Sequence, residues 1–175
     1  RRNDLDDPTI IAVSAAGVMA LRGTTGELLW TGLPQSGSFD YTMNPTVANL
    51  DQDPAPEIVV CTTAKNLQAF EADGSPKWYN ADQGVGLRVS GSAINAANLD
   101  GAGPAELVIG ASVYSGLTGR LIADGRTLGA VGENGGGVVQ SIVADVDADG
   151  VLEIVAGGTI YGFDGGSLHV ERQIP

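Results

Sequence analysis

The chain has 175 residues, among them 26 Gly and 8 Pro, and its 21 acidic and 9 basic residues give a formal net charge of −12. This length suits one well-formed core, and the Gly-rich composition predicts an all-β fold of short strands joined by tight turns. The negative charge argues against nucleic acid and anionic membranes as partners, and no stretch approaches the roughly 20 apolar residues that a membrane-spanning helix needs.

The first apolar strand is expected at 9–13, followed by a strand that reaches Trp30. The acidic residues within 3–7 do not fit the frame of the acidic loops found further along the chain. The first repeat therefore lacks an entering loop.

Further along, one segment recurs three times, at 45–51, 92–100 and 141–147, and each copy is followed by Glu and an apolar strand. The equivalent residues Asp51, Asp100 and Asp147 are 49 and 47 residues apart, and the equivalent residues Trp30 and Trp78 are 48 apart. A period in this range indicates a repeat architecture. We treat 1–175 as a single region with repeats at approximately 1–48, 49–97, 98–144 and 145–175.

Each period holds an apolar strand, a second strand such as 67–70, a turn at 73–74 and a third strand ending near Trp78. Short strands separated by Gly-containing turns are typical of a β-meander. With the apolar stretch before the next acidic loop, a period supplies four antiparallel strands, the content of one β-propeller blade. The last copy is expected to end one or two strands short. The chain then holds about 3.5 blades, a partial propeller or half of an assembled one.

The acidic loop of the third copy is the fullest candidate metal site. Carboxylates stand at its positions 1, 3, 5 and 9, Gly150 allows the tight turn, and the position-7 carbonyl supplies a backbone oxygen. Six to eight oxygens at roughly 2.3 to 2.6 Å are what Ca²⁺ requires. The predicted ligands are Asp145, Asp147, Asp149, Val151 and Glu153.

The other two loops follow the same frame with changes. The first has Pro54 where Gly is expected, which fixes φ at that position. The second has Ala102 at position 5 and loses one side-chain ligand, so we expect a weak or empty site there. The predicted ligands are Asn49, Asp51, Asp53, Ala55 and Glu57 in the first loop, and Asn98, Asp100 and Glu106 in the second. The alternative is that these residues serve turn chemistry alone.

The recurring acidic loop, followed by Glu and an apolar strand at this spacing, resembles the FG-GAP and VCBS-type repeats of integrin α-subunit propellers and of many bacterial surface and secreted proteins. The resemblance extends from about residue 9 to about residue 168. It implies a non-catalytic, calcium-binding extracellular propeller for adhesion, surface assembly or ligand recognition. Its partner would be another chain, either a copy or the rest of a larger propeller, or an extracellular ligand.

Two other functions stay open: the propeller portion of a secreted carbohydrate-active enzyme such as a polysaccharide lyase, and a structural subunit of a surface filament or layer. Cys61 is expected to be a buried strand thiol and His169 a surface residue. The segment 84–89 lacks the third Gly of a dinucleotide fingerprint, and 132–137 lacks the Lys of a phosphate-binding loop. Neither segment predicts catalysis.

Overall fold

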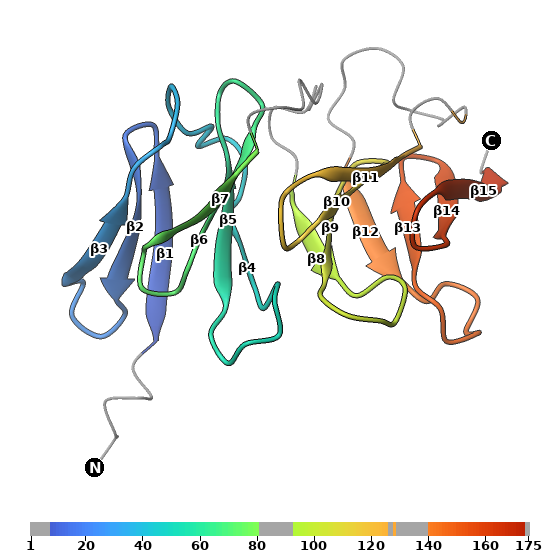
Figure 1. Ribbon diagram of the computed structural model, residues 1–175, viewed down its shortest axis with the longest axis horizontal. Helices are drawn as coiled ribbons and strands as arrows, with labels where there is room; N and C mark the ends of the chain where they lie inside the picture. Colours follow the sequence, from blue (N-terminus) through green and yellow to red (C-terminus); the bar gives the residue numbers. More distant parts are fainter. Residues whose placement is uncertain (1–7, 81–92, 126–127, 129–139, 174–175) are drawn as a thin grey trace.

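The computed structural model describes residues 8–80, 93–125, 128 and 140–173. All regular elements in these ranges are strands, and they form four antiparallel sheets arranged in a row (Figure 1). The first sheet consists of β1 (Thr9–Ser14), β2 (Gly17–Arg22) and β3 (Leu28–Gly32); the second of β4 (Thr46–Ala48), β5 (Glu57–Cys61), β6 (Leu67–Phe70) and β7 (Pro76–Tyr79); the third of β8 (Asn95–Ala97), β9 (Glu106–Ile109), β10 (Ser112–Ser115) and β11 (Leu121–Asp124); and the fourth of β12 (Ser141–Ala144), β13 (Glu153–Ala156), β14 (Thr159–Phe163) and β15 (Leu168–Gln173).

The middle strands of the second and third sheets are buried on both faces. Every residue of β5 and of β9 is buried, as expected for short apolar runs bounded by turn residues. Such strands need a neighbouring layer on each side. Three hydrophobic clusters supply these layers, one between each pair of consecutive sheets. Each sheet is therefore stabilised by packing against the next.

Two tryptophans fix how the first three sheets stack. The Trp30 indole N–H donates to the Ala72 carbonyl at 3.0 Å, and the Trp78 indole N–H donates to the Gly116 carbonyl at 2.9 Å, in both cases in the next sheet. A Cβ on Gly74 would approach the Trp30 ring to 2.5 Å, and the φ of Gly74 is +86°. Repeat packing thus accounts for both tryptophans.

The predicted four-stranded antiparallel unit is confirmed in the second, third and fourth sheets. The strand before each acidic loop pairs with the strand after it, so a sheet begins one strand earlier than the repeat boundaries suggested. For this reason the fourth sheet has four strands, although the last copy, counted from residue 145, supplies only three of them. The first sheet has three strands, and the described residues close no ring.

The two isolated reactive side chains occupy the places predicted for them. Cys61 is buried in the core between the second and third sheets, and burial raises the pKa of its thiol to about 12. His169 lies on β15 with an exposed side chain. No helix long and apolar enough to cross a membrane occurs in the described parts of the chain. The segments 84–89 and 132–137 lie outside the described residues.

Candidate metal sites

The three acidic loops join the first strand of a sheet to the second, and all three lie along the same edge of the molecule (lower edge of Figure 1). In each loop the position-9 glutamate is buried and accepts a hydrogen bond from the position-2 backbone N–H. The distances are 2.6 Å from Leu50 to Glu57, 2.9 Å from Leu99 to Glu106 and 2.7 Å from Val146 to Glu153. This bond ties the loop to the start of the second strand.

The loops also share one backbone conformation at position 4. The φ angles there are +70° at Gln52, +68° at Gly101 and +65° at Ala148. For a residue other than glycine, this left-handed conformation costs about 1 to 2 kcal/mol. Because two of the three residues adopt it without being glycine, the loop frame itself imposes the conformation.

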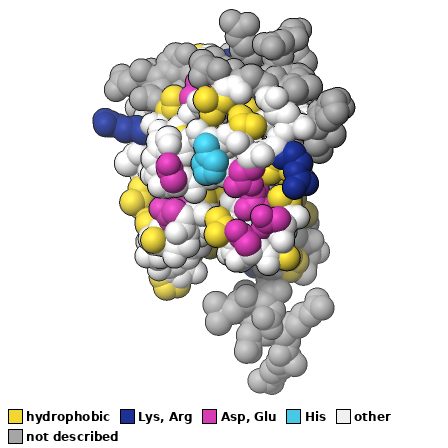
Figure 2. All heavy atoms as spheres, turned by 90° about the vertical axis from the view of Figure 1, so that its right-hand side faces the viewer, with side chains coloured by type: hydrophobic (Ala, Val, Ile, Leu, Met, Phe, Trp, Pro, Cys, Tyr) yellow, Lys and Arg dark blue, Asp and Glu magenta, His cyan; other side chains and the backbone are white. Residues whose placement is uncertain are grey.

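The loop in the fourth sheet brings three of its predicted ligands together. Asp145, Asp147 and Glu153 each offer one carboxylate oxygen, and these three oxygens lie within 4.8 Å of one another. Asp149 lies outside this group and accepts a hydrogen bond from Val151 N–H at 2.8 Å. Within the described part of the chain, no ion pair involves any of these four carboxylates. The end of the molecule formed by this sheet carries a visible patch of acidic side chains (Figure 2).

The loop in the second sheet has a different arrangement. Here the converging carboxylates are those of Asp51, Glu57 and Glu71, and one oxygen of each lies within 4.8 Å of the other two. The Lys77 ammonium group contacts all three carboxylates, at 2.6 Å from Asp51, 2.8 Å from Glu71 and 3.4 Å from Glu57. The remaining predicted ligands of this loop hydrogen-bond to one another. Asn49 Nδ2 donates to the Asp53 carbonyl, and Ala55 N–H donates to Asp53 Oδ1.

The ionisation of this group follows from its contacts. Burial opposes the charged form of Lys77, but hydrogen bonds with Asp51 and Glu71 and the charge of Glu57 outweigh it and raise the lysine pKa. The hydrogen bond from Lys77 lowers the pKa of Asp51. Lys77 and the three carboxylates thus form an internal ion-pair network.

The loop in the third sheet has two carboxylates in the frame, Asp100 and Glu106. Asp100 accepts a hydrogen bond from Ala102 N–H at 2.9 Å, and Asn98 Nδ2 donates to the Gly103 carbonyl at 3.1 Å. Burial raises the pKa of Glu106. With position 5 occupied by Ala102, this loop presents the fewest side-chain oxygens, in line with its sequence.

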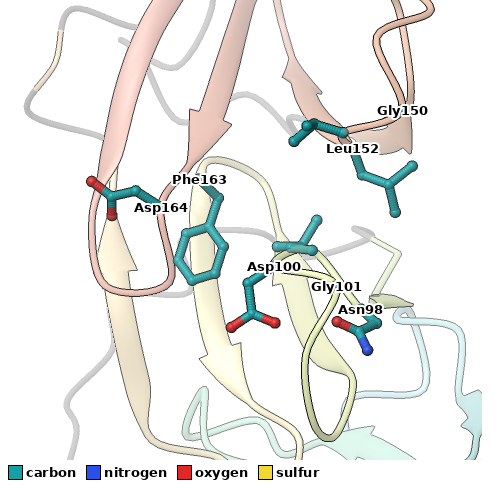
Figure 3. Close-up of a pocket in the computed structure, with 9 residues that line it drawn as sticks. Asn98, Asp100, Gly101, Gly150, Leu152, Phe163 and Asp164 are labelled. Atoms are coloured by element: carbon teal, nitrogen blue, oxygen red, sulfur yellow. The ribbon is translucent and has the colours of Figure 1, made fainter.

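A pocket of about 450 Å³ lies between this loop and the fourth sheet. It is lined by residues 98–101 and 150–152 of two neighbouring acidic loops, together with Phe163 and Asp164 at the end of β14 (Figure 3). The Phe163 ring lies beside Asp100. Asp164 accepts hydrogen bonds from Ser167 within its own turn, at 2.7 Å from the backbone N–H. The pocket thus combines apolar walls with acidic side chains.

Sequence reasoning missed Glu71 and Lys77. Both lie beyond the loop, Glu71 directly after β6 and Lys77 on β7, and only the folded sheet brings them to Asp51. A signal was present, since a lysine directly before Trp78 replaces the apolar Leu29 found before Trp30.

No known protein family model matches the chain, and no curated protein sequence matches it. Among solved structures, the chain is similar to the biofilm matrix protein Bap1 of Vibrio cholerae, with a TM-score of 0.71 and 25% sequence identity. The superposition covers 97% of this chain and 27% of Bap1, so the chain spans little more than a quarter of that protein. A rhamnogalacturonan lyase of Bacillus licheniformis matches with a TM-score of 0.38 and 16% identity, over 87% of this chain and 37% of the lyase. A score this low carries no argument about this chain.

Proposed function

We propose that this chain is a calcium-stabilised, non-catalytic module of an extracellular matrix or adhesion protein, and that its four sheets are blades of a β-propeller. The observation that carries the matrix role is the similarity to a biofilm matrix protein along 97% of the chain. The row of antiparallel sheets, each packed on the next, supports the blade assignment.

The calcium assignment centres on the loop of the fourth sheet. Asp145, Asp147 and Glu153 converge without a basic partner among the described residues, and mutual repulsion of such carboxylates is relieved by a bound cation. Hard oxygen ligands from a tight turn suit Ca²⁺, and extracellular modules bind it with dissociation constants on the order of 10⁻⁴ to 10⁻³ M. The ion would join the loop to β13 and stabilise the folded state by mass action.

The ends of the row support a protein partner, either a second copy or the rest of a larger propeller. On the first sheet Ile10, Leu28 and Leu29 are exposed, and on the fourth sheet Ile142 is exposed. In a closed ring the outer faces of these sheets would be covered. The lyase and filament alternatives raised by the sequence have no such observation of their own.

Thermal unfolding in calcium and in excess chelator tests the calcium assignment. At calcium concentrations about 100 times the dissociation constant, the expected stabilisation is about 2.7 kcal/mol, which raises the melting temperature by roughly 5 to 10 °C. Asp147→Asn should abolish this shift. An unchanged melting temperature of the wild type on chelation would contradict the assignment.

The extracellular role is tested separately, by labelling intact cells of the producing organism with an antibody against this chain. We expect labelling of the cell surface or the surrounding matrix before permeabilisation. Labelling that appears only after permeabilisation would refute the extracellular role while leaving the calcium result unaffected.

A further inference from the structure

The last strands of the first three sheets share a β-bulge. In β3, β7 and β11 one residue is skipped in the pairing register: Leu29, Lys77 and Ile122, respectively. Each stands directly before the packing position held by Trp30, Trp78 and Ala123. A bulge re-aims the side chain of the extra residue. Of these three residues only Lys77 is charged; the last strand of the fourth sheet, β15, has the same bulge, and its skipped residue is the negatively charged Glu171.

The bulge directs Lys77 into the position that a metal ion would occupy. Its Nζ lies 2.6 to 3.4 Å from oxygens of Asp51, Glu71 and Glu57, and these carboxylates form the same kind of group as the one in the fourth sheet. The lysine side chain is only 12% exposed. An ammonium group offers three donors around one compact charge, which matches three converging carboxylates.

The carboxylate partners are held in place independently of the lysine. Glu57 is fully buried and is anchored by Leu50 N–H, and Asp51 accepts Asp53 N–H at 3.0 Å. The loop frame therefore presents its oxygens whether the cation is organic or metallic. An ammonium and a Ca²⁺ ion within one such group would repel each other strongly, so the two are alternatives.

From this geometry we propose that Lys77 is a built-in cation that replaces the metal ion in the second sheet. The loop from Asn49 to Glu57 then takes no calcium in the native chain, and Lys77 determines that specificity. The inference deepens the proposed calcium function, since it rests on the acidic loops being cation sites. The inference assigns a lysine to the acidic loop of the second sheet and a metal ion to that of the fourth sheet.

Calcium titration by calorimetry tests the proposal on the full chain, with Lys77→Met compared with the wild type. Removal of the ammonium should add one calcium per chain to the wild-type number, with a dissociation constant on the order of 10⁻⁴ to 10⁻³ M. Asp51→Asn in the Lys77→Met background should remove the added site. An unchanged number of calcium ions in Lys77→Met would overturn the proposal.

Lys65→Met is the matched control, because Lys65 forms a 2.7 Å ion pair with Asp40 outside any acidic loop. It should gain no calcium. If Lys77→Met does not fold, Lys77→Gln, which keeps a polar side chain without the charge, is titrated with the same two outcomes.

The outcomes also separate this proposal from the proposed calcium function. If the wild type binds no calcium and Lys77→Met binds one, the metal assignment in the fourth sheet fails and the role of Lys77 stands. If the wild type binds calcium that Asp147→Asn removes, while Lys77→Met binds no more than the wild type, the function stands and the role of Lys77 is refuted.

Discussion

The acidic loops of the second and fourth sheets have the same backbone frame but balance their charge in different ways. In both, a buried glutamate accepts the position-2 N–H, and position 4 has a positive φ. In the second sheet, Lys77 contacts all three converging carboxylates, whereas the converging carboxylates of the fourth sheet have no ion-pair partner among the described residues. The comparison shows that one loop frame within a chain occurs both with a lysine among its carboxylates and without an ion-pair partner among the described residues.

The largest effect is expected from Lys77→Met measured in chelator, because it leaves the fully buried Glu57 without its cation. Removing one partner of a buried ion pair costs about 3 kcal/mol. Lys65→Met removes a more exposed lysine, 30% of whose side chain is accessible, and should cost less than about 1 kcal/mol. Denaturant unfolding measures both. Equal losses of unfolding free energy in the two variants would mean that the network around Lys77 stabilises the fold no more than the Lys65–Asp40 pair does.

Neutralising the equivalent aspartates should have opposite effects in chelator. Asp51→Asn removes the closest partner of Lys77 and lowers the melting temperature. Asp147→Asn relieves repulsion among carboxylates that have no ion-pair partner in the described residues, and raises it. Shifts of this kind should stay within about 4 °C in either direction. If differential scanning calorimetry shows melting temperatures shifted in the same direction for both variants, the proposed difference between the two loops is wrong.

A smaller contrast is expected at position 4. Ala148→Gly relieves a left-handed conformation and, after the extra chain entropy of glycine, should stabilise the protein by about 0.5 kcal/mol. Gln52→Gly gains the same relief but loses the hydrogen bond from Gln52 Nε2 to the Gly103 carbonyl, 2.8 Å long. We expect no net gain from it in urea unfolding. A larger gain from Gln52→Gly than from Ala148→Gly would contradict the shared-frame argument.

The smallest effect concerns acid, where the Lys65–Asp40 pair provides a baseline outside the loops. Burial opposes ionisation of Asp40, but hydrogen bonds from Lys65 and Thr42 outweigh it and lower its pKa below the ordinary value of 3.8. A lowered carboxyl pKa contributes stability above the unfolded-state value, and this contribution is lost as the pH falls through the folded-state value. Asp40→Asn should therefore flatten the loss of unfolding free energy below pH 3.8. Parallel curves for variant and wild type would exclude this contribution.

Much of the fold could be predicted from the sequence because its signals are local and repeated. The recurrence of Asp51, Asp100 and Asp147, each followed by Glu and an apolar strand, indicated the period and the antiparallel unit. The period does not state where a sheet begins. Pairing of β12 with β13 across the acidic loop decides this, and it makes the fourth sheet complete.

The charge balance of the candidate sites could be predicted only in part. The convergence of Asp145, Asp147 and Glu153 follows from their spacing in one loop. The contact between Lys77 and Asp51 depends on a bulge in β7 and on pairing across the sheet, which spacing along the chain does not encode. For the same reason Glu71 was not among the predicted ligands.

A crystal structure of the full chain grown with calcium tests the central claim most directly. Anomalous difference density should appear between Asp145, Asp147 and Glu153, while the position between Asp51, Glu57 and Glu71 should hold only the Lys77 ammonium. Density for a metal ion in the second sheet with Lys77 displaced, or an empty group in the fourth sheet at saturating calcium, would contradict the claim.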